Sequence, residues 1–332
     1  MKTITFRNAL AACAVNSAVA MLSTAGAATP DATLDRQPAL HVQAAEPLAA
    51  PEHTQILSAT RAGLRIVAVG DFGVIVLSDD DGTSFRQARS VGSRSTLTSV
   101  MFVDPKTGWA VGHWGAILKT VDGGENWALQ RSDIKTDRPL FSVYIKNSSE
   151  GFAVGLWSLL LHTSDGGHTW TQVKLPPPPG STKADTNLYR IFATASGTLF
   201  IAAEQGRVLR STDGGMSWTY LDTGYTGSFW SGVATRDGAV IVAGLRGTIY
   251  RSTDDGDHWQ RAKTPLEGSI TDIAQLANGD VVAAGLDGDE YTSHDGGTTF
   301  EGRQRFDRAA LTALAVSGNA KPIWFSKDGV VR

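Results

Sequence analysis

The chain has 332 residues, of which 42% are apolar, 36 are glycine and one is cysteine, and its formal net charge is −3. This apolar content is enough for a buried core and excludes global disorder, while the weak negative charge excludes a broadly basic nucleic-acid-binding protein. A single cysteine excludes an intrachain disulfide and a zinc centre built from several thiolates.

The amino end has the pattern of an export signal. Two basic residues precede a mostly apolar stretch at residues 9–22, and the triplet Ala25-Gly26-Ala27 fits the small-x-small rule for signal peptidase. We therefore expect residues 1–27 to be a signal peptide that is cleaved after Ala27, and the mature protein to be periplasmic or extracellular.

A lipoprotein signal, with the sequence LAAC ending at a lipid-bearing Cys13, is an alternative interpretation. Only five residues separate Arg7 from Cys13. This spacing is too short for the apolar region of a signal, and the apolar run continues beyond the cysteine. The cleaved signal peptide is therefore favoured, and in either case the folded part lies outside the cytoplasm.

Six octapeptides share the pattern Ser/Thr-x-Asp-x-Gly-x-x-Trp/Phe, which is known as the Asp box. They occupy residues 78–85, 120–127, 163–170, 211–218, 252–259 and 293–300. Their aromatic ends lie 42, 43, 48, 41 and 41 residues apart, and the longest step contains the proline-rich run Pro176–Pro179. An internal period of about 42 residues predicts a repeat architecture.

Each box belongs to a unit of four β-rich runs. Two runs joined by a tight turn precede the box, at residues 66–77, 109–119, 152–162, 200–210, 240–251 and 281–291. Another run comes before such a pair, at residues 97–103, 140–145, 188–193, 229–234, 270–275 and 311–316, and a short fourth run follows each aromatic residue. Four antiparallel strands in about 42 residues predict the blades of an all-β propeller.

The number of units predicts seven blades across residues 54–332. Six units are complete, whereas the last has three runs, at 311–316, 322–326 and 329–332, and no box. An orphan β-rich run, LHVQA at residues 40–44, lies within the N-terminal segment 28–53. We therefore expect this N-terminal strand to supply the missing outer strand of the seventh blade and to close the ring.

The Asp boxes are expected to be structural, with direct ligand binding as the alternative. Their hydroxyl and carboxylate can bond the backbone of the turn, their glycine permits a positive φ, and their aromatic side chain packs on the blade. The acidic run at residues 79–82 does not fit an EF-hand calcium loop, because the spacing of such a loop would place Leu77 and Ala88, which cannot coordinate calcium, at ligand positions. The box residues are Ser78, Asp80, Gly82, Phe85, Thr120, Asp122, Gly124, Trp127, Thr163, Asp165, Gly167, Trp170, Ser211, Asp213, Gly215, Trp218, Ser252, Asp254, Gly256, Trp259, Ser293, Asp295, Gly297 and Phe300.

Recognisable catalytic motifs do not occur in the sequence. There is no Gly-x-Gly, no P-loop and no Gly-x-Ser-x-Gly pattern, and the seven histidines include no His-x-x-x-His pair. We therefore expect a protein with no cofactor, no metal and no enzymatic activity.

The segment at residues 97–127, LTSVMFVDPKTGWAVGHWGAILKTVDGGENW, resembles the repeat of the photosystem II assembly/stability factor family, a relative of other bacterial neuraminidase repeat (BNR) propellers. The resemblance covers residues 54–332. It implies a seven-bladed, non-enzymatic assembly factor that acts outside the cytoplasm on a membrane-protein partner. Two boxes depart from the pattern, because Asp81 and Asp255 stand where the other boxes have glycine.

Sialidases and other glycoside hydrolases carry the same boxes, so a carbohydrate-active enzyme or a lectin is the alternative function. A sialidase is expected to have an Arg-Ile-Pro segment near its start, whereas this chain has Arg-Ile-Val at 65–67 and Arg-Ile-Phe at 190–192. Glu204 and Asp272 are the carboxylates expected near the central channel, where such groups more often line the wet axis than catalyse.

The turns between the second and third strands form the candidate partner-binding face, because up-and-down strands place them opposite the boxes and beside the blade-to-blade crossovers. Aromatic and arginine side chains there are typical of protein-binding hot spots. We expect this face to bind an extracytoplasmic segment of a membrane protein, rather than a nucleic acid or a glycan. The alternative is that its tryptophans pack between blades. The candidate residues are Phe72, Arg94, His113, Trp114, Arg138, Trp157, Glu204, Arg246, Asp287 and Lys327.

Overall fold

The computed structural model describes residues 42–332, so the predictions for residues 1–27, for Cys13 and for residues 40–41 lie outside the described range. Within residues 42–332, no helix is long and apolar enough to cross a membrane. The helical elements there are the three-residue 3-10 turns η1 (Pro51–His53), η2 (Asp71–Gly73), η3 (His113–Gly115) and η4 (Leu245–Gly247).

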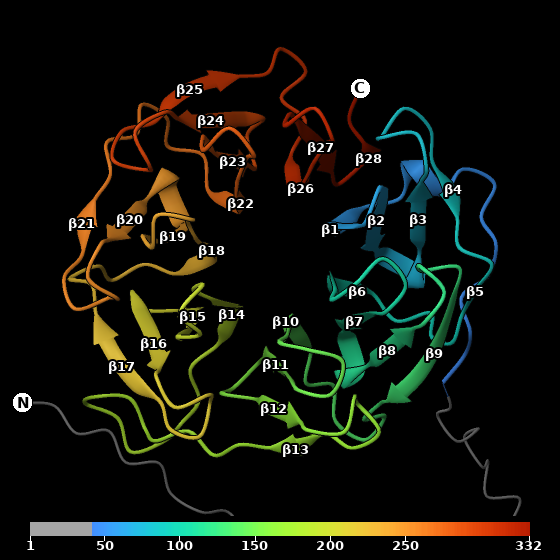
Figure 1. Ribbon diagram of the computed structural model, residues 1–332, viewed down its shortest axis with the longest axis horizontal. Coiled ribbons are helices and arrows are strands. Elements are labelled where there is room, and N and C mark those ends of the chain that lie inside the picture. Colours follow the sequence, from blue (N-terminus) through green and yellow to red (C-terminus); the bar gives the residue numbers. More distant parts are fainter. Residues whose placement is uncertain (1–41) are drawn as a thin grey trace, which may run out of the picture. The chain divides into compact units, whose positions relative to one another are not determined.

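The described residues form a ring of seven antiparallel sheets, which Figure 1 shows down its axis. Apart from β5 (Ser90–Val91), which is added at the outer edge of blade 2, the strands of each sheet follow one another in chain order from the axis outwards, and we refer to them as strands A to D of a blade. The predicted all-β, seven-bladed propeller is therefore confirmed.

The strand bounds show how regularly the blades repeat. Blade 1 contains β1 (Ile56–Ala62), β2 (Arg65–Gly70), β3 (Ile75–Ser78) and β4 (Arg86–Gln87). Blade 2 contains β6 (Leu97–Phe102), β7 (Gly108–Gly112), β8 (Ile117–Thr120) and β9 (Asn126–Arg131), with β5 (Ser90–Val91) added in parallel beside β9. Blade 3 contains β10 (Leu140–Ile145), β11 (Gly151–Gly155), β12 (Leu160–Thr163) and β13 (Thr171–Gln172).

The remaining blades follow the same order. Blade 4 contains β14 (Leu188–Ala193), β15 (Leu199–Ala203), β16 (Arg207–Ser211) and β17 (Thr219–Asp222). Blade 5 contains β18 (Phe229–Ala234), β19 (Val240–Gly244), β20 (Ile249–Ser252) and β21 (Gln260–Arg261). Blade 6 contains β22 (Ile270–Gln275), β23 (Val281–Gly285), β24 (Asp289–Ser293) and β25 (Glu301–Gln304). Blade 7 contains β26 (Leu311–Val316), β27 (Pro322–Ser326) and β28 (Gly329–Val330).

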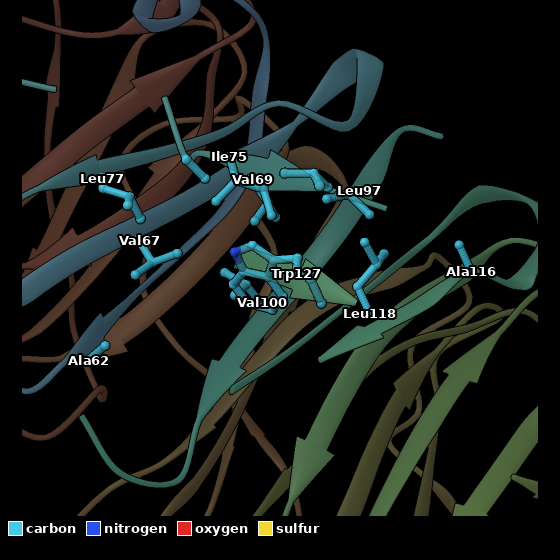
Figure 2. Close-up of a cluster of buried hydrophobic side chains, with 13 residues drawn as sticks. Ala62, Val67, Val69, Ile75, Leu77, Leu97, Val100, Ala116, Leu118 and Trp127 are labelled. Carbon is cyan, nitrogen blue, oxygen red and sulfur yellow. The ribbon is translucent and has the colours of Figure 1, made fainter. Parts of the chain in front are cut away.

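The hydrophobic cores lie between neighbouring blades. Strand B is buried at every residue in blades 2 to 6, because both faces of its sheet are covered by other blades. Figure 2 shows one such core, in which Val69 and Leu77 of blade 1 meet Leu97, Leu118 and Trp127 of blade 2. Burial on both faces explains why the B strands are continuously apolar instead of alternating.

The expected closing strand is not found in the described part of the chain. Blade 7 keeps three strands, and residues 42–44 lie instead beside the crossover into blade 2, where the Arg94 N–H donates to the Gln43 carbonyl at 2.8 Å. The reason lies at the edge of blade 7, where η1 packs against β28. A Cβ atom on Gly329 would lie 1.9 Å from the Glu52 carbonyl oxygen, so η1 takes the place that an added strand would need.

Bonds between inner strands close the ring instead. The Thr312 hydroxyl of blade 7 donates to the Ile56 carbonyl of blade 1. The hydroxyls of Thr98 and Thr271 donate in the same way to the carbonyl of the first residue of strand A in the following blade, at 2.6 and 3.0 Å. A buried core that includes Ile56 and Phe325 fills the junction between blades 7 and 1. The closure therefore repeats an ordinary blade interface and needs no exchanged strand.

Candidate protein-binding face

One backbone hydrogen bond fixes the turns between strands B and C in all seven blades. The residue after strand B donates its N–H to the carbonyl of the residue before strand A of the same blade, at 2.9–3.1 Å. The donor and acceptor pairs are Asp71 and Gln55, His113 and Thr96, Leu156 and Pro139, Glu204 and Asn187, Leu245 and Ser228, Leu286 and Ser269, and Lys327 and Ala310. The B–C turns therefore lie on one face with the crossovers that lead into the next blade, while the Asp boxes connect strands C and D at the other face.

The six Asp boxes have one shared hydrogen-bond network. In the box of blade 4, the Ser211 hydroxyl donates to Asp213 at 2.8 Å and accepts from the Gly215 N–H at 2.8 Å. Ser217, the residue before the aromatic side chain, donates to Asp213 through both its N–H (2.9 Å) and its hydroxyl (2.6 Å). This last position, which is Ser, Asn, Thr or His in the other boxes, was not singled out from the sequence, although it is polar in every repeat.

These hydrogen bonds strongly favour the ionised form of the box carboxylates. Bonds from the side chain and backbone of Ser84 lower the pKa of Asp80 to about 2, and bonds from Ser217 lower the pKa of Asp213 to about 2. Because the carboxylate oxygens already accept hydrogen bonds from their own turn, they stabilise the turn rather than face a ligand. Within residues 42–332, no group of three or more acidic, histidine or cysteine side chains is placed to hold a metal ion.

The glycine at the fifth position of each box also contacts the preceding blade. A Cβ atom at Gly215, where φ is +88°, would lie 2.4 Å from Cζ of Phe152 in blade 3. At Gly297 the nearest atom would be Cδ1 of Ile241 in blade 5, at 2.4 Å. The box glycine therefore serves both the turn and the interface between blades.

The B–C turns use a left-handed backbone at residues that are not glycine. The φ angle is 56° at Phe72, 57° at Trp114, 53° at Trp157, 59° at Gln205 and 55° at Arg246. A left-handed conformation costs roughly 1–2 kcal/mol at a residue with a Cβ atom. The exposed fractions are 63% for Phe72, 38% for Trp114 and 54% for Trp157. These aromatic side chains are thus exposed to solvent on turns whose left-handed backbone Gln205 and Arg246 share.

The structure brings some of the candidate residues together and separates others. Phe72 and Arg94 line one hollow of about 130 Å³, and Arg94 and Trp114 line another of about 320 Å³. Arg138 follows Asp137, which accepts a hydrogen bond from the Trp114 turn, so it lies near the second hollow. Trp157, Arg246, Asp287 and Lys327 belong to the turns of blades 3, 5, 6 and 7, so they are spread around the ring.

Two candidate residues take part in local contacts. Glu204 accepts from Asn187 through the backbone N–H at 2.8 Å and through Nδ2 at 3.0 Å, which fixes the crossover into blade 4. His113 Nδ1 lies 3.4 Å from Asp137, whose other oxygen accepts from the Trp114 N–H at 2.7 Å. Both residues therefore hold the face in shape.

An aromatic arc on the inner strands was not identified from the sequence. Strand A has a β-bulge at its second residue in all seven blades. This residue is Phe141, Tyr189 and Trp230 in blades 3 to 5, and all three side chains are half-buried. The Phe141 and Tyr189 rings stack with their centroids 5.6 Å apart, and burial raises the pKa of Tyr189. The bulged residue is the second of strand A, so these three residues lie at the end of the strand that is next to the B–C face.

Sequence signals for the missed aromatic residues do exist. Aligning the starts of the A strands gives LTS, LFS, LYR, FWS, ITD and LTA for blades 2 to 7, with aromatic residues only in the middle of the series. Phe306, in the crossover from blade 6 to blade 7, is fully exposed on the same face and has no counterpart in the other repeats.

Comparison with known proteins adds a family. A family profile described as Photosynthesis system II assembly factor YCF48 matches residues 88–247 and 197–330, which together span more than two thirds of the chain. Among curated proteins, no sequence matches this chain.

Solved structures of similar shape come from several protein classes. One described as "YCF48 bound to D1 peptide" is 19% identical, with a TM-score of 0.68, and the match covers 87% of this chain and 94% of that one. YCF48 from Cyanidioschyzon merolae is 17% identical, with a TM-score of 0.67 and coverage of 86% and 95%. A streptogramin B lyase is 13% identical, with a TM-score of 0.71 and coverage of 87% and 96%. At these identities the structures support the fold, whereas the profile match over most of the chain decides the family. The chain belongs to the Photosynthesis system II assembly factor YCF48 family.

Proposed function

We propose that this protein is an exported, non-enzymatic assembly factor whose B–C face binds an extracytoplasmic segment of a membrane protein. The observation that carries the proposal is the display of Phe72, Trp114 and Trp157 in left-handed, solvent-exposed turns. The family description supports the assembly role, and the relative solved with a D1 peptide supports a peptide from a membrane protein as the class of partner. The amino-terminal signal pattern supports export.

The chemistry of the face suits an extended peptide. Large aromatic side chains bury much apolar area at a small cost in side-chain entropy, and they dominate binding hot spots together with arginine. The turn aromatics lie on blades 1 to 3, and the aromatic arc continues around the axis on blades 3 to 5. Such a path suits a segment that crosses several blades.

The test compares the two faces of the ring. Replacing Trp114, Trp157 and Arg246 by alanine should reduce capture of partner proteins from native membranes by at least tenfold, with the thermal midpoint nearly unchanged. The matched control replaces Leu64, Val121 and Met216, which are 85%, 67% and 80% exposed on the Asp-box face. Capture of the same identified membrane protein by the first triple variant at the wild-type level would count against this face.

A second measurement addresses the absence of enzymatic activity. The mature protein is expected to leave fluorogenic sialosides and polysaccharides unchanged after long incubation. Turnover that disappears on replacing Glu204 or Asp272 would instead establish the carbohydrate-active alternative.

A further inference from the structure

A basic side chain of one blade binds the Asp box of the next blade at four places around the ring. In the boxes of blades 2, 3, 5 and 6, the main-chain carbonyl of the fourth box residue accepts a hydrogen bond from the preceding blade. Charged donors make stronger hydrogen bonds than neutral ones, so these bonds join each box firmly to its neighbour. The donor and acceptor pairs are Arg65 and Gly123 (2.9 Å), Lys119 and Gly166 (2.9 Å), Arg210 and Asp255 (2.7 Å), and Arg251 and Gly296 (2.8 Å).

The box of blade 4 has no such bond. Lys119, Arg210 and Arg251 each stand immediately before the box of their own blade, and in blade 3 this position is His162. The His162 ring stacks on Phe152, with the ring centroids 4.7 Å apart. Among the residues that the structure describes, none donates a hydrogen bond to the carbonyl of Gly214, the fourth residue of the blade 4 box.

The space beside Gly214 is open as well. A Cβ atom on Gly166 would lie 3.3 Å from Nζ of Lys119. A Cβ atom on Gly296 would lie 3.7 Å from Nη2 of Arg251, so in both boxes the basic group fills the space next to the glycine. A Cβ atom on Gly214 would have no atom within 4 Å outside the adjacent residues. A hollow of about 230 Å³ lies at this place, and its lining includes Glu150, Phe152, His162, Gly214 and Gly215.

The hollow offers a cation the same surroundings as the occupied sites. Phe152 takes the strand position of Trp109 in blade 2, and the Trp109 ring centroid lies 4.7 Å from Nζ of Lys119. The face of an aromatic ring attracts an ammonium or guanidinium group. The carboxylate of Glu150, which also binds Lys146 at 2.9 Å, adds a negative charge. An aromatic ring, a carboxylate and a free carbonyl are therefore present here without the basic side chain.

We propose that this hollow between blades 3 and 4 binds a lysine or arginine side chain of a partner polypeptide. The charged group donates to the Gly214 carbonyl and lies near Phe152 and Glu150. A polypeptide is the source because all four occupied sites hold a lysine or arginine side chain. The hollow is formed by the A–B turn of blade 3 and the C–D turn of blade 4, so it lies on the Asp-box face. It is separate from the B–C face and does not depend on the function proposed there.

Binding is tested by NMR with the isotope-labelled full chain and the tripeptide acetyl-Gly-Lys-Gly-amide. The backbone amide signals of Glu150, Gly214 and Gly215 should shift saturably at about millimolar peptide, as expected for a single side chain. The arginine analogue should shift the same signals, whereas the norleucine analogue, which lacks the ammonium group, should not. Equal shifts with the lysine and norleucine peptides, or none with the two basic peptides, would overturn the proposal. Tighter binding of a free diamine than of either basic peptide would overturn the assignment to a polypeptide.

Variants of the hollow identify the site. His162→Lys should supply the missing cation from blade 3, as Lys119 does from blade 2, and should weaken binding of the lysine peptide by about tenfold. Thr292→Lys is the matched control, because it adds the same charge before the box of blade 6, and blade 7 has no box to receive it. Glu150→Gln keeps the shape of the hollow and removes its negative charge, so it should weaken binding by about threefold or more. Unchanged binding by both His162→Lys and Glu150→Gln, or an equal loss in Thr292→Lys, would contradict a cation site in this hollow.

Discussion

On the Asp-box face, six turns repeat the same side chains, which form hydrogen bonds within their own turn. On the B–C face, seven turns share one main-chain hydrogen bond, while their side chains differ. Ser211 and Asp213 bond within their own turn, and Trp218 is 94% buried behind them. On the opposite face, Trp114 and Trp157 occupy equivalent left-handed positions and extend into solvent. Identical side chains in a repeat thus indicate folding, while a constant backbone with changing, exposed side chains indicates recognition.

The largest expected effect is on the free energy of unfolding, and it distinguishes a buried aromatic residue of an Asp box from an exposed one of a B–C turn. Trp127, in the box of blade 2, is 3% exposed and donates its indole N–H to the Gly124 carbonyl at 2.8 Å. Trp127→Ala should therefore lower the free energy of unfolding by about 3–5 kcal/mol, whereas Trp157→Ala should change it by less than about 0.5 kcal/mol. Urea unfolding followed by circular dichroism measures both values, and equal losses would remove the distinction between the faces.

A second pair of substitutions separates the turn from the blade interface. Gly214 and Gly215 both have positive φ, at 73° and 88°, but only Gly215 lies against Phe152 of the preceding blade. Each alanine variant pays the left-handed strain, and Gly215→Ala adds a clash that should cost about 1–3 kcal/mol more. The difference between the unfolding free energies of the two variants measures how much the contact with the preceding blade contributes to stability. A difference near zero would show that the box glycine is needed only for the turn.

The box face could be predicted from the sequence because its physics is local. A hydroxyl, a carboxylate and a glycine within five residues bond one another wherever the octapeptide occurs, so the six boxes indicate turns without knowledge of the fold. The period then gives the blade count by arithmetic.

The partner face and the ring closure depend on residues that are far apart in the sequence. The bulge at Phe141 and Tyr189, near the start of strand A, is visible only in the pairing of strands A and B. The N-terminal segment could equally have added to several outer edges, and the placement of η1 beside β28 is what excludes blade 7. Residues 42–44 form no strand and lie beside the crossover into blade 2, so a β-rich run in a sequence does not by itself predict that it completes a sheet.

The third prediction concerns Asp81, a departure from the box pattern that the sequence alone left unexplained. Its carboxylate accepts from Nη1 of Arg61 at 2.7 Å and from the Gly318 N–H of blade 7 at 2.8 Å, so it joins the first and last blades. Asp81→Ala should lower the free energy of unfolding by about 1 kcal/mol, a value that allows for the partial exposure of the pair. Asp255→Ala is the control, since that carboxylate accepts one side-chain bond, from Thr198 at 3.2 Å.

Hydrogen exchange locates the effect of Asp81→Ala. The amides of β26 and β27 should exchange faster in this variant, because blade 7 lacks a fourth strand and depends on its contacts with blade 1. Faster exchange confined to the box of blade 1 would show that Asp81 stabilises only its own turn.

The smallest expected effect is the response of the box carboxylates to acid. The pKa of Asp213 is lowered to about 2 by hydrogen bonds from Ser217, from an ordinary value of 3.8. A pKa that is lower in the folded state contributes stability that is complete above pH 4 and disappears as the pH falls through about 2. Asp213→Asn should therefore flatten the decline in unfolding free energy between pH 4 and pH 2. An unchanged slope for Asp213→Asn would mean that the ionised carboxylate adds nothing beyond the neutral hydrogen bonds, and the boxes would then act through glycine and aromatic packing alone.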